Sequence, residues 1–258
     1  MVFEDFILLQ KLLASLLVGY LLGSVPFAHL AARFKGVDIF ATGNRRAGTA
    51  NVFWNVSRRT GVMVFAADVA KGSLAVLIAQ LMDLQGPLVI LAGGAAVAGH
   101  WKSLFTGFKG GDGMATLLGV TLIVVPALGP LCIGFGFIAV ILAWKSPYRS
   151  AVGIAVSFSL MLGIALYFQD RLDLVYGLIG LGLLVLTHNV LIRRRMAALG
   201  VAPKDEFDAL ELDAASVDFC VEIDSLHHSD DLGATLKEVA RVMKHGGVLV
   251  ILDRSHNN

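Results

Sequence analysis

Gly99-His-Trp-Lys-Ser-Leu-Phe-Thr-Gly-Phe-Lys-Gly-Gly-Asp-Gly-Met-Ala-Thr116 separates two long apolar runs and concentrates glycine and charge in a short stretch. Glycine permits positive φ and lets the backbone approach a ligand closely. Consecutive free N–H groups in such a turn form an anion site, to which Lys109 adds a positive charge. A helix is expected from Met114 onward, and its N-terminus also favours an anion. Two interpretations fit the local sequence: a phosphate cradle, or a tight turn between two packed membrane helices.

The composition is typical of an integral membrane protein. Mean hydropathy is +0.74, and 56% of the residues are hydrophobic. Charged residues make up 16% of the chain, against about 25% in soluble domains. Glu4 and Asp5 precede the first apolar run, where a cleavable signal peptide has a basic segment. Cys132 and Cys220 give neither a disulfide framework nor a metal-ligand spacing, so we expect no metal and no cofactor.

Seven apolar stretches are expected to cross the bilayer, where a helical span needs roughly 20 residues. They are residues 7–32, 62–82, 87–98, 114–125, 128–143, 151–168 and 174–192. Gly23-Ser24-Val25-Pro26 interrupts the first stretch, and Pro126 separates the fourth from the fifth. Six spans is the alternative, in which residues 114–143 form one long broken helix.

The distribution of Lys and Arg orients these spans, because basic residues accumulate in cytoplasmic loops. With seven spans and the N-terminus outside, the inside segments are 33–61, 99–113, 144–150 and the part after residue 192. Up to Arg195, these segments hold thirteen Lys and Arg residues, whereas the outside segments hold Lys11 and Arg171. We therefore expect an all-α membrane helix bundle in the plasma (cytoplasmic) membrane, with its C-terminus and glycine-rich stretch in the cytoplasm.

Ionisable side chains inside the later spans matter because charge is costly there and is usually paired or functional. Asp68 and Lys71 are three residues apart, share a helix face and can pair. A structural ion pair is the favoured interpretation, and a functional role is the alternative. His188, near the end of the last span, is either an interfacial hydrogen-bonding residue or part of a site.

Several stretches carry a family resemblance. They are Gly23-Ser24-Val25-Pro26-Phe27, Asp38 through Asn51-Val52, Asp68-x-x-Lys71-Gly72, Gly99-His100, Gly107 through Thr116, Tyr148-x-Ser150 and His188. In this order they resemble the bacterial acyl-phosphate:glycerol-3-phosphate acyltransferases of the PlsY type, which are seven-span enzymes with a cytoplasmic active site. The resemblance implies transfer of an acyl group from acyl phosphate to the 1-hydroxyl of glycerol 3-phosphate, giving lysophosphatidic acid and phosphate. The implied partners are these two substrates and the lipid bilayer, with no nucleic acid.

The same resemblance selects the candidate site residues. The implied catalytic residues are His188, Ser150 and Asn51. The implied phosphate- and substrate-binding residues are Lys109, Gly110, Gly111, Gly113, Arg45, Arg46, Asn44, His100 and Asp112. Glycine N–H groups and cations suit two phosphate-bearing substrates.

Polar positions depart from the family pattern. A serine, a glycine, an asparagine and a later arginine of its first loop are Asn44, Arg45, Arg46 and Trp54 here. Its second loop lysine is Asp112, an asparagine three positions after the histidine is Leu191, and a second serine is Gly153. A charge at close range is worth on the order of 1–4 kcal/mol, so Asp112 matters most. Either the anion site is rewired, with Asp112 paired to Arg45 or Arg46, or the chain is a non-catalytic homologue that binds a lipid or an anion.

The C-terminal part differs in charge from the rest. Residues 1–204 carry a formal charge of +9, and residues 205–258 carry −8. We expect a soluble α/β tail with strands at 217–223 and 248–252 and a helix at 231–244. Asp213 through Phe219, Leu226-His227-His228, and Glu238 through Gly247 resemble the C-terminal half of class I S-adenosylmethionine-dependent methyltransferases. Methyltransferase activity is disfavoured, because no glycine-rich cofactor turn precedes Asp213.

The expected domains are therefore a PlsY-like membrane domain at residues 1–195, a linker at 196–212 and a partial methyltransferase-like segment at 213–258.

Overall fold

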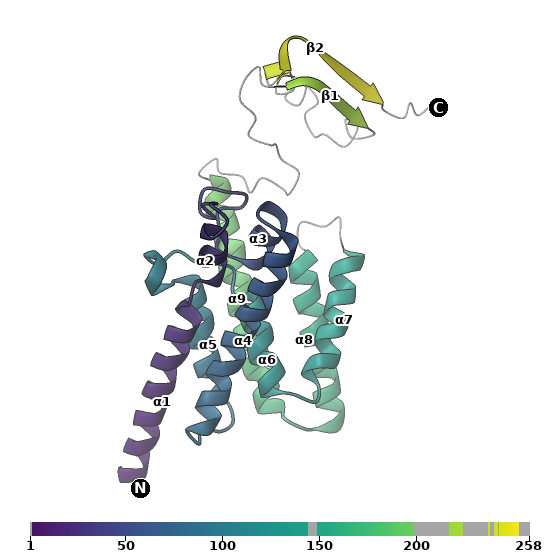
Figure 1. The fold of residues 1–258 in the computed structure, drawn as a ribbon. Coiled ribbons are helices and arrows are strands. Elements are labelled where there is room, and N and C mark those ends of the chain that lie inside the picture. Colours follow the sequence, from purple (N-terminus) through teal and green to yellow (C-terminus); the bar gives the residue numbers. More distant parts are fainter. Residues whose placement is uncertain are drawn as a thin grey trace. The chain divides into compact units, whose positions relative to one another are not determined.

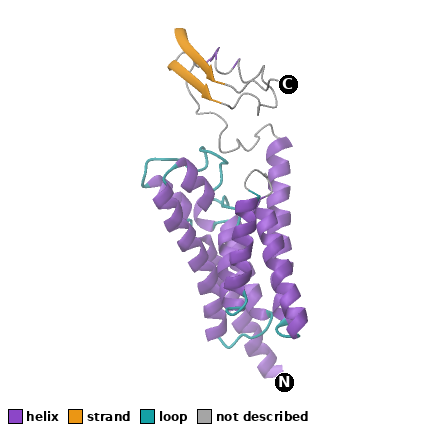
Figure 2. Cartoon of the chain, turned by 90° about the vertical axis from the view of Figure 1, so that its right-hand side faces the viewer, coloured by secondary structure: helices purple, strands orange, loops and turns teal. Residues whose placement is uncertain are grey.

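The computed structural model describes residues 2–143, 149–198, 217–223, 237, 240–241 and 243–252. Contacts divide the chain into two units, Met1–Glu206 and Phe207–Asn258. The described part of the first unit is helical. Its helices are α1 (Val2–Ser24), α2 (Phe27–Arg33), α3 (Thr49–Asn55), α4 (Arg58–Leu81), α5 (Leu88–Trp101), the 3₁₀ helix η1 (Leu104–Thr106), α6 (Met114–Val124), α7 (Gly129–Leu142), α8 (Arg149–Phe168) and α9 (Leu172–Ala198). The long helices run side by side with roughly aligned axes, and α2 and α3 lie at the end opposite the N-terminus of α1 (Figures 1 and 2).

Within the described residues, five helical segments are long and apolar enough to cross a membrane. They are Phe3–Arg33, Arg58–Leu81, Leu88–Thr106, Arg149–Phe168 and Leu172–Ile192. The helices α6 and α7 are apolar but shorter, with 11 and 14 residues. At about 1.5 Å per residue, α6 covers roughly half of a hydrocarbon core about 30 Å thick. The membrane helix bundle is thus confirmed, and a count of seven spans depends on α6 and α7.

The first apolar run breaks into α1 and α2 at Val25-Pro26, as its proline suggested. Proline lacks an N–H and cannot continue the helical hydrogen-bond ladder. Neighbouring segments donate hydrogen bonds to the carbonyls at the break: Lys71 Nζ donates to the Val25 carbonyl at 3.3 Å, and Ser103 Oγ to the Ser24 carbonyl at 2.5 Å. A broken helix at membrane depth is tolerated because neighbours satisfy its backbone in this way.

Small residues bring the helix backbones close together. Gly72 of α4 faces the Thr116 carbonyl of α6, and Gly119 of α6 faces the Val69 carbonyl of α4, so closely that a methyl group at either glycine would overlap the opposite backbone. Gly23 of α1 is equally close to the backbone of α5. Glycine-lined contacts are typical of membrane helices, since lipid provides no hydrophobic drive to associate and close packing must do so.

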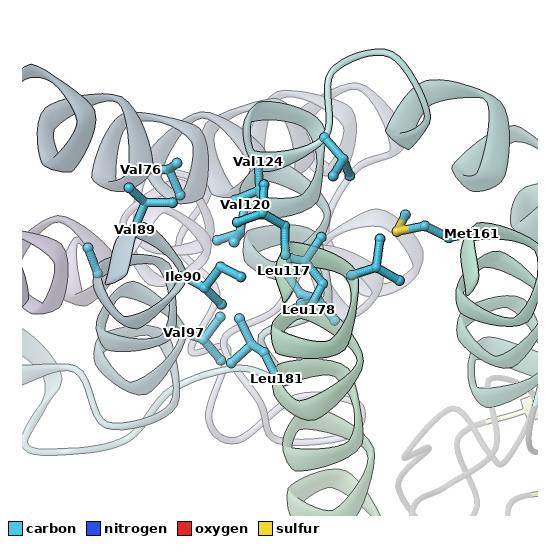
Figure 3. Close-up of a cluster of buried hydrophobic side chains, with 14 of the residues drawn as sticks. Val76, Val89, Ile90, Val97, Leu117, Val120, Val124, Met161, Leu178 and Leu181 are labelled. Atoms are coloured by element: carbon cyan, nitrogen blue, oxygen red, sulfur yellow. The ribbon is translucent and has the colours of Figure 1, made fainter. Parts of the chain in front are cut away.

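The apolar core lies among α4, α5, α6 and α9 (Figure 3). Val76, Val97, Val120, Val175 and Leu178 are fully buried there. The helices α7 and α8 pack mainly on each other at one side of the bundle (Figure 1). Most of their exposed side chains are apolar, among them Phe135, Ile138 and Ile141 of α7, which is the expected composition of a lipid-facing surface.

Two local expectations are corrected. The first loop contains the short helix α3, which was not predicted. The helix α9 continues to Ala198, so residues 196–198 belong to it and not to a linker. Alanine and methionine are strong helix formers, and Met196-Ala-Ala198 extends the helix past the three arginines.

The second unit contains two parallel strands, β1 (Val217–Ile223) and β2 (Met243–Leu252). The range of β1 is the expected one. The strand β2 begins five residues before the expected position, so the predicted helix is wrong at Met243 and Lys244, where Met243 pairs with Val217. Residues 237 and 240–241 are helical, and the rest of the predicted 231–242 segment lies outside the described residues.

We predict that Gly72→Ala destabilises the fold by about 1–3 kcal/mol, because the added methyl group overpacks the α4–α6 contact. The measurement is thermal unfolding of the detergent-solubilised chain. Gly180→Ala is the matched control, since no atom lies within 4 Å of the position its methyl group would take. Equal unfolding midpoints for the two variants would contradict the close approach of α4 and α6.

Candidate functional site

The glycine-rich loop between α5 and α6 is folded back against the first loop. Gly107, Phe108 and Gly113 have positive φ of 62°, 62° and 81°. The Ala47 N–H donates to the Gly110 carbonyl at 3.3 Å, and the Gly111 N–H donates to the His100 carbonyl at 3.1 Å. The Gly111 amide, expected to bind phosphate, is therefore used within the protein. Among the described residues, the N–H groups of Asp112 and Gly113 have no hydrogen-bond partner.

Asp112 holds the start of α6. Its carboxylate accepts a hydrogen bond from the Met114 N–H at 3.1 Å. Its carbonyl accepts two more, from Trp101 Nε1 at 2.9 Å and from Asn189 Nδ2 at 3.0 Å. A carboxylate at a helix N-terminus is stabilised by the free N–H groups and the helix dipole. Asp112 thus places a negative group of the protein itself where a phosphate was expected.

Arg46 and Asp112 are connected through Asn189 of α9. Arg46 Nη1 donates to Asn189 Oδ1 at 3.0 Å, while the amide nitrogen of the same side chain holds the Asp112 carbonyl. Asn189 is 6% exposed, so a single buried amide joins three segments that are far apart in sequence. Arg45 has a φ of 56° and an exposed side chain, which makes no hydrogen bond or ion pair with a described residue. Arg46 is thus linked through Asn189 to the backbone carbonyl of Asp112, whereas the expected pairing concerned the Asp112 carboxylate.

His188 lies against Trp101 at the same end of the bundle. The two rings are stacked, with centroids 4.0 Å apart and planes 13° apart. The stack fixes the imidazole plane, and Trp101 is itself fixed by its bond to the Asp112 carbonyl. His188 Nε2 is buried and has no hydrogen-bond partner among the described residues. The histidine thus presents an uncommitted ring nitrogen beside the loop of Asp112.

Asn51 and Asn44 have roles other than those expected. Asn51 is 2% exposed, and its Nδ2 donates to the carbonyls of Ile39, Thr42 and Arg46 at 3.2, 3.0 and 2.9 Å. Its Oδ1 accepts from Asn55 at 2.9 Å. With every polar atom engaged, Asn51 shapes the first loop and is not placed to act on a substrate. Asn44 Oδ1 accepts the Arg46 N–H at 3.1 Å, which forms a local turn.

Ser150 and Lys109 are not joined to this cluster by any contact among the described residues. Ser150 is a half-buried residue in the first turn of α8 and makes no hydrogen bond with a described residue. Lys109 is exposed, and its Nζ lies 5.7 Å from the centre of the Phe40 ring. Of the site residues predicted from the sequence, the structure therefore brings together Arg46, Asp112 and His188.

A second, buried cluster surrounds the break in the first span. Lys71 Nζ lies 2.8 Å from Asp68 Oδ1, which is the ion pair expected from their spacing. His100 Nδ1 lies 3.6 Å from the same oxygen, and all three side chains are nearly inaccessible. Together with Ser24, the three residues line a void of about 10 Å³, close to the volume that a single water needs. The void is too small for a phosphate, and the side-chain contact of His100 described here is the one with Asp68.

Sequence reasoning missed Trp101 and Asn189. Both are polar-tipped residues at the end of an apolar helix, and Asn189 directly follows His188. A buried amide near the end of a membrane span was the available signal, because such groups must find partners. No group of three or more His, Cys, Asp or Glu side chains suited to a metal occurs in the described part of the chain.

Comparisons with known proteins identify the family of the membrane unit. A family model described as glycerol-3-phosphate acyltransferase matches residues 13–198, and a methyltransferase domain model matches residues 193–251. The glycerol-3-phosphate acyltransferase of Geotalea daltonii is 37% identical over 182 residues, which cover 69% of this chain and 91% of the relative. That of Parasynechococcus marenigrum is 40% identical over 58% of this chain and 71% of the relative.

Two solved structures share the fold. The glycerol 3-phosphate form of PlsY (YgiH), an integral membrane glycerol 3-phosphate acyltransferase, is 30% identical with a TM-score of 0.59. The alignment covers 74% of this chain and 94% of that one. The lysophosphatidic acid form gives a TM-score of 0.58 at the same identity, over 74% of this chain and 93% of that one.

Removing one partner of the buried ion pair is predicted to be costly. Lys71→Met should lower the free energy of unfolding by about 3–5 kcal/mol, because Asp68 is left charged and buried. The double variant Asp68→Asn/Lys71→Met should recover part of this loss, as judged by thermal unfolding in detergent. If the double variant is no more stable than Lys71→Met, the loss of stability comes instead from the missing hydrogen bond to the Val25 carbonyl.

The hydrogen bond that Asp112 accepts at the start of α6 can be tested separately from the negative charge of its carboxylate. Asp112→Ala should cost about 1 kcal/mol of stability, because the Met114 N–H loses its acceptor. Asp112→Asn keeps an oxygen acceptor and removes the charge, so its stability should stay close to that of the parent. If unfolding measurements show both variants equally destabilised, the carboxylate acts through its charge alone.

Proposed function

Because the chain belongs to the glycerol-3-phosphate acyltransferase family, we propose that it transfers an acyl group from acyl phosphate to glycerol 3-phosphate. The products are lysophosphatidic acid and inorganic phosphate. The observation that carries this proposal is the convergence of three groups: the buried Asn189 joins Arg46 to the Asp112 loop, and His188 stacks on Trp101, which is bonded to the same loop. A guanidinium suits a phosphate, and an uncommitted imidazole nitrogen suits a hydroxyl proton.

The chemistry needs little beyond binding and proton handling. The 1-hydroxyl oxygen attacks the acyl carbonyl carbon, the bond from that carbon to the phosphate oxygen breaks, and phosphate leaves with the electron pair. His188 Nε2 accepts the hydroxyl proton, and Arg46 balances charge on a phosphate. Acyl phosphate is already activated, so holding the two substrates together supplies most of the acceleration.

Asp112 favours a second candidate, a diverged homologue that binds a lipid or an anion without catalysis. Its carboxylate accepts the Met114 N–H at the start of α6, where a phosphate would otherwise receive such a bond. A negative group in that position repels an incoming phosphate by on the order of 1–4 kcal/mol. The two candidates share the same site and differ in whether acyl transfer occurs there.

The proposal includes seven spans in the plasma membrane, with α6 and α7 as the two short ones. The site then faces the cytoplasm. Support comes from the basic residues, since Arg33, Arg46, Arg58 and Lys102 belong to the segments that the Lys and Arg distribution puts inside. Soluble glycerol 3-phosphate reaches the site from the cytoplasm, and the acyl chain stays in the bilayer.

We predict that the purified chain in lipid forms lysophosphatidic acid from acyl phosphate and glycerol 3-phosphate. His188→Ala should lower the rate by about 10²–10⁴-fold, the usual contribution of a general base. Thr187→Ala is the matched control, because Thr187 is exposed and next in sequence. Product formation by chromatography of radiolabelled glycerol 3-phosphate is the measurement.

Absence of product from the parent would reject the transferase and leave the anion-binding homologue. In that case Asp112→Lys restores activity if this one charge blocks the site. Loss of an existing activity in Asp112→Lys would show that the carboxylate belongs to the working site.

A further inference from the structure

A second hollow has a volume of about 520 Å³ and is lined by residues of α2, the first loop, η1 and the segment after η1. The lining residues that carry its chemistry are His29, Arg33, Asp38, Phe40, Thr106 and Lys109. This volume is within the range of ligand pockets. Arg46, Asp112, His188 and Asn189 do not line it.

The hollow carries a positive charge. Arg33 and Lys109 are exposed cations at its wall, and Asp38 is its acidic lining residue. The Asp38 carboxylate already accepts the Phe40 N–H at 3.0 Å. His29 Nδ1 is buried and has no hydrogen-bond partner among the described residues. Two cations and an uncommitted ring nitrogen favour a ligand with several anionic oxygens.

The Phe40 ring positions two of these groups. His29 stacks on it with centroids 5.4 Å apart and planes 29° apart, and Lys109 Nζ lies 5.7 Å from its centre. The Lys109 carbonyl accepts a hydrogen bond from the Thr106 hydroxyl, which fixes the backbone at this point. The cation–π contact draws Lys109 toward the hollow.

The surroundings of the hollow match the surface of a bilayer. Two candidate membrane spans end here, Phe3–Arg33 and Leu88–Thr106. Phe34, Phe105 and Phe108 are 88%, 60% and 54% exposed beside the lining residues. Exposed aromatic side chains next to basic ones are typical of protein surfaces at lipid headgroup level, where basic pockets bind anionic headgroups.

We propose that this hollow binds a phosphate-bearing anion and that it is separate from the acyl-transfer site. An anionic phospholipid headgroup and free phosphate share this chemistry, so both are possible sources. Arg33 and Lys109 contact the phosphate oxygens, His29 Nδ1 adds a third polar contact, and the three phenylalanines contact the lipid around it. Lys109, expected from sequence to bind phosphate, does so here. The inference goes beyond the proposed acyl transfer and does not depend on it.

The test compares Arg33→Gln with Arg59→Gln in the full-length chain. Arg59 is an exposed arginine that does not line the hollow, so both variants lose the same charge. Short-chain phosphatidylglycerol, short-chain phosphatidylcholine and inorganic phosphate are titrated in a neutral detergent, and the unfolding temperature is followed. We expect Arg33→Gln to weaken apparent binding of the anionic probe by about tenfold or more, the usual effect of one charge-assisted bond. The control variant should bind like the parent.

The outcomes separate the two sources of phosphate. Arg33-dependent stabilisation by phosphatidylglycerol, with none by phosphatidylcholine, supports the lipid headgroup. Arg33-dependent stabilisation by inorganic phosphate supports the free anion. Equal responses of Arg33→Gln and Arg59→Gln to every probe would overturn the proposal. Binding is measured without acyl transfer, so a failure of the proposed enzymatic function would leave this result unaffected.

Discussion

The first unit depends on the two contacts of the buried Lys71 ammonium. It lies between the Asp68 carboxylate and the Val25 carbonyl at the proline break, a carbonyl that also accepts the Phe27 N–H at 3.1 Å. A broken span can stay in the bilayer only if such groups are satisfied internally. Ser103, in the segment that follows α5, donates a hydrogen bond to the Ser24 carbonyl. Side chains from two separate segments therefore stabilise the break. The buried charge is tolerated because it has both an ionic partner and a backbone acceptor.

The buried cluster of Asp68, Lys71 and His100 also positions the candidate site. His100 approaches Asp68 through its side chain, while its carbonyl receives the Gly111 N–H. The glycine-rich loop is thereby held at the end of α5, and Gly110 receives the Ala47 N–H from the first loop. Further along the loop, the Asn189 side chain is hydrogen-bonded to both the Asp112 carbonyl and the Arg46 side chain. The site residues are thus placed by backbone contacts that begin at a buried ion pair.

The sequence predicted what depends on local spacing. The membrane helices follow from the lengths of the apolar runs, and the Asp68–Lys71 pair follows from helical periodicity. Contacts between distant segments were not predictable in the same way. Asn189 and Trp101 find their partners only after folding. A motif also does not state which hydrogen bonds an amide uses, so the structural role of Asn51 was unexpected. The family resemblance suggested that the whole glycine-rich loop binds phosphate. In the structure, however, Lys109 lies over the Phe40 ring, while the Asp112 carboxylate accepts the Met114 N–H.

That division limits what the charge at Asp112 can do. Lys109 lies over the ring of Phe40 with His29 and Arg33 nearby, while the Asp112 carboxylate lies against the first turn of α6. Between them, Gly111 is so closely packed against His100 and the Ala47 carbonyl that a methyl group there would overlap both. A negative charge at position 112 acts directly on an anion at the start of α6, and solvent around the exposed Lys109 weakens its effect on the hollow.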